Sequence, residues 1–183
     1  MTENMLIQNI IITDRLILEK IKPDDHDFLI SLLNSKGWIE NIGDRNIHSV
    51  NDAVSYIKKI LETENFYYWV VRIKGENIPI GIVSFIKRSY LDHFDIGFAL
   101  LPFHHGRGYG YEASKAVLSM VSKLPTHNIV LATTRPSNTG SITLLTKLGF
   151  RFEREMELET GKLHIYTNEF NFQESSARAS EKI

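Results

Sequence analysis

The sequence predicts an α/β protein with a mixed sheet and helices packed against it. Segments rich in β-branched residues alternate with segments whose apolar residues recur at helical spacing. Three strand-like segments in the middle of the chain are joined by short links, which favours antiparallel neighbours. The length of 183 residues corresponds to one domain, and a chain of this size needs no disulfide or metal to supplement its core.

The first half of the chain begins with a strand-like segment at Ile10–Lys20, which is rich in β-branched residues. Pro23 opens a helix, and Ser49 with Asp52 three residues later gives a capping-box-like start for a second helix. Turn-forming or charged residues bound the three expected central strands, which are Phe66–Lys74, Ile78–Lys87 and Phe94–Leu100.

The second half of the chain alternates helices and strands. Helices are expected over Gly108–Lys123 and over Asn138–Leu148, the latter ending at Gly149. The expected strands are His127–Thr134, Arg151–Glu157 and Lys162–Phe170. We assign residues 1–172 to a single domain and residues 173–183 to a polar tail that is expected to be disordered.

The composition excludes several functional classes. Cysteine is absent, which excludes a disulfide scaffold, a cysteine-ligated metal site and a cysteine nucleophile. The formal net charge of −1 and the lack of a broad basic surface argue against nucleic-acid binding. The N-terminal residues lack the basic region of a signal peptide, and no apolar run approaches the ~20 residues that cross a bilayer. We therefore expect a cytoplasmic protein with no membrane partner.

The most informative segment lies between the third expected central strand and the helix that follows it. It reads HHGRGYGYEA over residues 104–113, and it holds three of the 11 glycines of the chain. Glycine lets the backbone turn tightly and present its N–H groups without a Cβ in the way. The N-terminus of the next helix adds unpaired N–H groups and the positive end of its dipole. Such a loop suits a phosphate or pyrophosphate group, although a plain connecting turn can have the same composition.

The charge distribution favours an anionic ligand in this part of the chain. Residues 101–152 contain six basic residues and one acid, a net charge of +5, whereas the rest of the chain sums to −6. The Walker motif is absent, so a P-loop is not expected. Gly108, Gly110 and Ala113 match the dinucleotide fingerprint G-x-G-x-x-[GA], but the acid that should follow about 20 residues later is missing. An NADP-binding protein, with Arg135 on the 2′-phosphate, is the weaker alternative.

Four motifs resemble those of the GNAT superfamily of N-acetyltransferases and keep their order. His105–Gly110 resembles the [QR]-x-x-G-x-[GA] loop for acetyl-CoA, and HGRGYGYEA is close to the WGKGYATEA found in the RimJ/RimL-type branch, which acetylates ribosomal-protein N-termini. Thr13–Leu18 resembles the opening strand T-x-R-L-x-L, and Asp95–Phe98 resembles the E-I-G-Y strand of that branch. Asn138–Phe150 resembles its N-x-x-S-x-x-L-x-x-K-x-G-F segment.

The resemblance implies the GNAT fold, a central, mostly antiparallel mixed sheet flanked by helices, and acetyl-CoA as cosubstrate. It places the cofactor on the loop residues His105, Gly106, Arg107, Gly108, Tyr109 and Gly110, with Asn138 and Ser141 near the pantetheine arm. Two positions depart from the family pattern. His105 stands at the usual Gln or Arg position, and Thr146 stands where many members carry a Tyr that protonates the leaving thiolate, so Ser141 or a water would take that role.

The chemistry requires that an amine lose its proton before it attacks a thioester. We predict Asp95 as the base, with Glu112 as a second candidate that suits a helix-dipole partner equally well. A backbone N–H near the Asp95 strand would meet the developing oxyanion. Trp38 and Arg45, in the connection between the first two helices, are candidates for contact with the acceptor. The histidines have no metal-ligand spacing, so no metal is expected.

The resulting interpretation is an N-acetyltransferase that moves an acetyl group directly to a primary amine in a ternary complex. The acceptor stays open between a protein N-terminus and a small-molecule amine. A catalytically weak CoA-binding or CoA-sensing module on the same fold is the alternative from another functional class. The sequence is compatible with a monomer or a homodimer.

Overall fold

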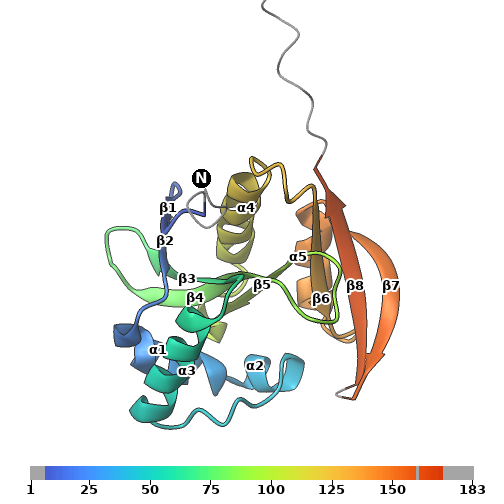
Figure 1. The fold of residues 1–183 in the computed structure, drawn as a ribbon. Helices are drawn as coiled ribbons and strands as arrows, with labels where there is room; N and C mark the ends of the chain where they lie inside the picture. Colours follow the sequence, from blue (N-terminus) through green and yellow to red (C-terminus); the bar gives the residue numbers. More distant parts are fainter. Residues whose placement is uncertain (1–6, 160, 171–183) are drawn as a thin grey trace, which may run out of the picture.

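The computed structural model describes residues 7–159 and 161–170, and the tail predicted at 173–183 lies outside them. Within these residues the strands form one sheet in the order β1-β2-β3-β4-β5-β6-β8-β7 (Figure 1). The strands are β1 (Ile10–Ile12), β2 (Leu16–Lys20), β3 (Phe66–Ile73), β4 (Pro79–Ile86), β5 (Asp95–Leu100), β6 (Ile129–Thr134), β7 (Arg151–Leu158) and β8 (Gly161–Glu169). All neighbours are antiparallel except β5 and β6, which confirms the predicted mixed, mostly antiparallel sheet.

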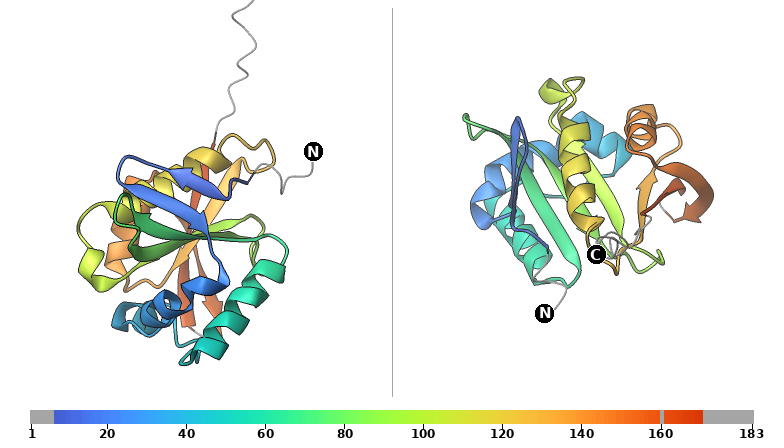
Figure 2. Two further views of the ribbon diagram at one scale, coloured as in Figure 1. Left: turned by 90° about the vertical axis from the view of Figure 1, so that its left-hand side faces the viewer. Right: turned by 90° about the horizontal axis from the view of Figure 1, so that it is seen from above.

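Helices cover both faces of this sheet, as Figure 1 and the two views in Figure 2 show. One face carries α1 (His26–Leu33), α2 (Lys36–Asn41) and α3 (Val50–Glu62), and the other carries α4 (Tyr109–Val121) and α5 (Thr139–Lys147). Two short 3₁₀ turns, η2 (Pro23–Asp25) and η3 (Pro102–His104), precede α1 and the glycine loop. The core is accordingly divided between a cluster under α4 and a cluster under α1–α3.

Local sequence chemistry accounts for several of these elements. The eight residues of β4 are almost all apolar because helices cover the strand on both faces. Helix α3 begins at the predicted capping box, in which Ser49 Oγ accepts from the Asp52 N–H and the Asp52 carboxylate accepts from the Ser49 N–H. Helix α5 ends before Gly149, whose φ of 89° lies in the left-handed region.

Two features of the first half differ from the prediction. The segment expected as one strand, Ile10–Lys20, is a hairpin, because Thr13 turns the chain and its Oγ1 accepts from the Leu16 N–H at 2.9 Å. Trp38 lies within the six-residue helix α2, not in a connection between helices. This helix is too short to show helical periodicity in the sequence, and Gly37 lowers its helix propensity.

The sheet opens at β5 and β6, which are the one parallel pair among the described strands. Strands β5 and β6 pair at Asp95 and Leu131, the one register position recorded between them in the described chain. In Figure 1, β3 and β4 run across the picture whereas β6, β7 and β8 run from top to bottom on its right side, and β5 and β6 diverge beyond this point. We call the opening between Ile96–Leu100 and Ala132–Thr134 the strand gap.

Candidate active site

Backbone groups of β5 beyond Asp95 have no recorded strand partner on the β6 side within the described residues. The Leu101 N–H donates to Ile80 O on the β4 side, whereas Phe94 O accepts from the Leu131 N–H on the β6 side. Because successive residues of a strand point to opposite sides, the N–H groups of Phe98 and Leu100 point into the gap. A linear ligand with amide groups can therefore pair with β5 as an additional strand would.

The predicted glycine loop lies at the open end of the gap, between η3 and α4. Gly106 and Gly108 have φ angles of 72° and 80°, and Gly108 is the N-cap of α4 without a side-chain cap. The first-turn N–H groups of this 13-residue helix are thus left for a ligand. The His105 ring nitrogen Nε2 lies 2.9 Å from Leu100 O, and the Arg107 guanidinium lies 4.9 Å from the centre of the Phe103 ring. The side chains of the loop are engaged with protein groups, so we expect the amides to bind the anion.

A group of hydrogen bonds that the sequence did not predict joins this loop and the start of α4 to the β1–β2 hairpin. It is centred on Arg15 and Glu112, and we call it the Arg15–Glu112 bracket. Arg15 Nε donates to Glu112 Oε2 at 2.6 Å, and Arg15 Nη1 donates to Arg107 O at 3.0 Å. Glu112 Oε1 also accepts from the Arg15 N–H and from Thr13 Oγ1. The guanidinium stacks 4.7 Å from the centre of the Tyr109 ring. Partial burial alone would raise the pKa of Glu112, but the hydrogen bonds from Thr13 and Arg15 outweigh it and lower that pKa. Such a carboxylate suits a structural bracket better than a base.

Replacing Arg15 by glutamine should weaken acetyl-CoA binding by about fivefold, about 1 kcal/mol for a partly exposed ion pair. The loop carbonyl at Arg107 loses a donor and Glu112 loses its cation, so the loop has to be ordered by the ligand. Calorimetry with acetyl-CoA measures the effect. Lys74→Gln is the matched control, because Lys74 Nζ donates to Thr13 O on the same hairpin without contacting Glu112. An equal loss in both variants would assign the effect to charge and not to the bracket.

The bracket also predicts a dependence of unfolding on pH. The pKa of Glu112 is lower in the folded protein than its ordinary value. The bracket therefore stabilises the fold at pH values above that ordinary pKa. This stability is lost as the pH falls through the lowered pKa. Thermal unfolding of Arg15→Gln should therefore show a smaller loss on acidification than the parent protein.

The second helix N-terminus at the open end belongs to α5. Asn138 caps it, with Oδ1 accepting from the Ser141 N–H at 3.1 Å. A Cβ at Gly110 of α4 would lie 3.2 Å from the Leu144 side chain of α5 and 3.5 Å from the Leu100 side chain of β5, so glycine permits close approach of α4 to both elements. The structure thus brings together the predicted loop, Asn138 and Ser141. Thr146 lies a full turn further along, where its Oγ1 bonds to Ile142 O.

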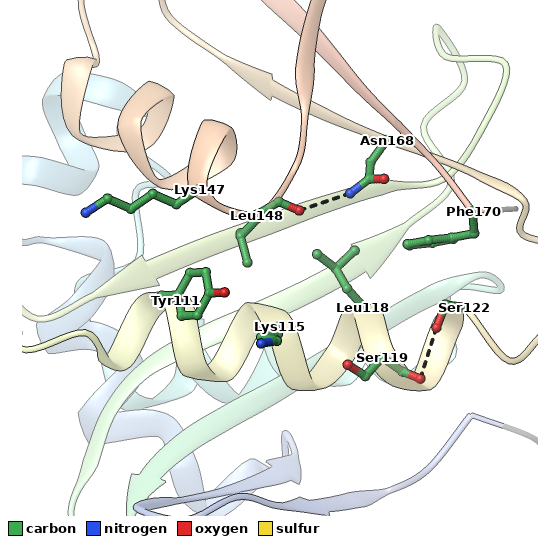
Figure 3. A pocket seen from close by; sticks show the side chains of 9 residues that line it. All are labelled: Tyr111, Lys115, Leu118, Ser119, Ser122, Lys147, Leu148, Asn168 and Phe170. Atoms are coloured by element: carbon green, nitrogen blue, oxygen red, sulfur yellow. Dashed lines mark hydrogen bonds between the residues drawn. The ribbon is translucent and has the colours of Figure 1, made fainter.

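A groove of about 140 Å³ runs between α4 and the end of α5 (Figure 3). Tyr111, Lys115 and Ser119 line it from α4, Ser122 lines it from the C-cap of that helix, and Lys147 lines it from α5. The Lys115 ammonium lies 5.5 Å from the centre of the Tyr111 ring. The two lysines give this groove a positive charge adjacent to the glycine loop.

Asp95 lies at the closed end of the strand gap and is 1% exposed. Its Oδ1 accepts from Arg88 Nε at 2.9 Å, and the Thr133 side chain also hydrogen-bonds to the carboxylate. Burial raises the pKa of Asp95, and the Arg88 charge and these hydrogen bonds offset part of the rise. The sequence did not predict the contacts of Asp95 with Arg88 and Thr133 or its deep burial.

The two predicted acceptor residues lie on the α1–α3 face but differ in exposure. Trp38 is 8% exposed and packs in the core cluster under α1–α3, and its Nε1 has no hydrogen-bond partner among the described residues. Arg45 is exposed between α2 and α3. Trp38 is therefore primarily an anchor, whereas Arg45 is available to a ligand.

A sheet that splays beside a glycine loop and two helix N-termini defines an acetyltransferase of the GNAT class. Residues 15–151 match the acetyltransferase (GNAT) domain family, well over half of the chain, so the chain belongs to this family. It is 24% identical over 143 residues to an uncharacterized N-acetyltransferase, YnaD, of Bacillus subtilis, covering 78% of this chain and 83% of that protein.

Solved structures share the fold. A GNAT-family acetyltransferase from Bacillus anthracis has a TM-score of 0.75 at 22% identity, with 87% of this chain and 98% of that chain covered. RimL, a ribosomal L7/L12 alpha-N-protein acetyltransferase solved with coenzyme A, has a TM-score of 0.77 at 15% identity. The match covers 88% of this chain and 98% of that chain. The GNAT fold and the acetyltransferase class expected from the sequence are confirmed, and they displace the NADP-binding alternative.

Within residues 7–159 and 161–170, no group of three or more His, Asp or Glu side chains is placed to hold a metal ion. Over the same ranges, none of the helices has the length and apolar character that a membrane span requires.

Proposed function

We propose that the protein is an acetyl-CoA-dependent N-acetyltransferase of the RimJ/RimL-type branch that transfers the acetyl group directly to a primary amine, and that it acts in the cytoplasm. The observation that carries this proposal is the strand gap, which ends at the N-termini of α4 and α5. The glycine loop precedes α4, and its Gly108 caps that helix without a side-chain hydrogen bond, which leaves first-turn N–H groups for an anion. The gap offers N–H groups from Phe98 and Leu100 along its length.

In this proposal the cofactor lies with its pyrophosphate on the amides of Gly106–Gly110 and its pantetheine arm in the strand gap. Asn138 and Ser141 border the arm from α5, because their backbones form the first turn of that helix. The Phe98 and Leu100 N–H groups pair with the amide groups of the arm, or with the thioester oxygen as negative charge develops on it. The Lys115 and Lys147 ammonium groups attract the remaining phosphate to the groove in Figure 3.

Removal of the 3′-phosphate tests the role of the groove. Coenzyme A should bind about fivefold more tightly than dephospho-coenzyme A, and Lys147→Gln should narrow that difference. Lys123→Gln is the control, because Lys123 is exposed, lies in the same basic segment and does not line the groove. Equal affinities for coenzyme A and dephospho-coenzyme A would show that none of Lys115, Arg135 and Lys147 contacts the 3′-phosphate.

The proposed reaction removes two protons from the acceptor nitrogen and returns one of them to the sulfur of coenzyme A. Asp95 takes the proton of the acceptor ammonium through a water, since its carboxylate is too buried to meet the amine freely. The neutral amine attacks the thioester carbon, and the C–S bond breaks as the tetrahedral intermediate collapses. The nitrogen then gives up its second proton, which passes through Ser141 or water to the leaving thiolate. Because the chain has no cysteine, no acetyl-cysteine intermediate forms.

Turnover distinguishes this enzyme from a CoA-sensing module on the same fold. The test is thiol release from acetyl-CoA in the presence of primary amines, both peptides with free N-termini and small amines. An enzyme releases coenzyme A only when an acceptor amine is present. Saturable binding of acetyl-CoA with no release for any amine would favour the sensing module.

A further inference from the structure

The face of the sheet under α1–α3 carries a polar cluster that the cofactor does not use. It consists of Arg45, Tyr56, Tyr68, Arg88 and Tyr90 beside Asp95, and we call it the tyrosine–arginine cluster. Its members come from four places in the fold: the α2–α3 connection, α3, β3 and the β4–β5 loop. Such convergence from distant segments is what a binding site requires.

Sheet register places this cluster next to the strand gap. Tyr68 pairs with Ser84, and Ser84 pairs with Gly97 of β5. Residues directly opposite in a sheet share a face, so only two small residues separate Tyr68 from the gap. The approach is close: a Cβ at Gly97 would lie 2.7 Å from Ser84 Oγ. Tyr68 therefore lies on the α1–α3 face of the sheet, two strands away from the strand gap.

The tyrosines lie within electrostatic reach of both arginines. The charged side chains that act on the Tyr56 hydroxyl are Arg45 and Arg88, and both also act on Tyr68 and Tyr90. The Arg88 guanidinium lies 6.0 Å from the centre of the Tyr90 ring. Burial raises the pKa of all three phenols, so their hydroxyl groups stay neutral and can donate hydrogen bonds.

The charge of the cluster is not balanced. Asp95 accepts from Arg88 and compensates one of the two cations. Arg45 has no ion-pair partner within the part of the chain that the structure describes. Two arginines and one aspartate leave a net charge of +1 on a partly desolvated face that also offers phenol donors. A guanidinium and neutral hydroxyls together match the acceptor geometry of a carboxylate.

We propose that the acceptor is an amine that also carries a carboxylate, held by Arg45, Arg88 and the cluster's tyrosines while its amine enters the strand gap. This inference rests on the proposed acetyl transfer and names the substrate class of the same site. It also excludes a class: a polyamine or another polycation brings further positive charge to a face that is already positive.

Matched pairs of acceptors test the proposal. The substrates are ω-amino acids of two to six carbons and the corresponding amides, with spermidine as a polycation, and the measurement is kcat/KM for coenzyme A release. For the best chain length the acid should exceed its amide by at least tenfold. A ratio near one at every length, or spermidine as the best acceptor, would overturn the inference.

Substitutions within the tyrosine–arginine cluster test whether this cluster causes the preference for the acid over its amide. Arg45→Gln should lower the acid-to-amide ratio several-fold, mainly through KM for the acid. Arg88→Lys keeps a charge beside Asp95 but loses the planar fork, and should lower the ratio too. Lys58→Gln is the control, because Lys58 lies on the same helix as Tyr56, is 72% exposed at its side chain and carries the same charge. A ratio that falls equally in this control would assign the effect to net charge.

Calorimetry separates this inference from the proposed function. The acids and amides are titrated into the protein with and without bound coenzyme A. Tighter binding of an acid than of its amide, lost in Arg45→Gln, supports the acceptor class even where turnover is slow. Coenzyme A binding with no preference for acids overturns the acceptor class and leaves the cofactor site standing, whereas absence of coenzyme A binding contradicts the proposed function itself.

Discussion

Replacing Gly108 by aspartate should lower the affinity for acetyl-CoA by well over tenfold, more than ~1.4 kcal/mol. The glycine caps α4 with a φ of 80°, and the proposed pyrophosphate lies on the amides beside it. An aspartate brings a carboxylate to that position and prefers a different backbone angle. Calorimetry with acetyl-CoA measures the loss, and thermal unfolding establishes that the variant is folded.

Two further variants separate charge from backbone strain in this experiment. Gly108→Ala keeps the strain and omits the charge, so it should lose less affinity than Gly108→Asp. Gly43→Asp adds the same side chain at another left-handed glycine, with a φ of 101° and open space around its Cβ position, between α2 and α3. It should bind acetyl-CoA normally. Unchanged affinity in folded Gly108→Asp would remove the loop from the cofactor site.

Replacing Asp95 by asparagine should lower turnover by ~10²-fold or more, the usual scale for loss of a general base. The KM for acetyl-CoA should barely change, because the loop amides hold the cofactor. Burial raises the pKa of Asp95, so the base becomes active at a higher pH than an ordinary carboxylate would. The rate of the parent protein should therefore rise with pH along a limb that flattens in the variant.

Asp92→Asn is the control for Asp95→Asn, because Asp92 is exposed in the β4–β5 loop close to the same strand. It removes one negative charge without touching Arg88 and should leave both the rate and the pH limb unchanged. Since Asp95→Asn also deprives Arg88 of its anion, unfolding should be measured beside turnover. Near-normal turnover with lowered stability would make Asp95 a structural residue that holds Arg88 and Thr133 at the closed end of the gap.

The elements predicted correctly from the sequence are those that local chemistry determines. The Ser49 capping box starts α3, and Gly149 ends α5, because both depend on residues a few positions apart. The hairpin at Thr13 was missed because its apolar flanks read as one strand. Helix α2 was missed because six residues give too little periodicity.

The geometry of the candidate site was predictable where it depends on the local backbone, and it was not predictable where it depends on contacts between distant segments. The glycine loop could be predicted from its composition and from its position before a helix. The Arg15–Glu112 bracket joins residues that are 97 positions apart. The T-x-R-L-x-L motif contains Arg15, but it does not indicate that Glu112 is its partner. The burial of Asp95 and its pairing with Arg88 depend on how the β4–β5 loop folds over the sheet, which no local pattern encodes.

The central claim is direct transfer of an acetyl group from acetyl-CoA in the strand gap to a primary amine. The most direct measurement uses acetyl-CoA carrying ¹³C in its acetyl group, incubated with the protein and amines with and without a carboxylate, and analysed by mass spectrometry. We predict that the label appears in an amide of an acceptor amine, in equal amount to the coenzyme A released, and never on the protein. Label that remains in acetyl-CoA, or that appears only as free acetate, would contradict this account.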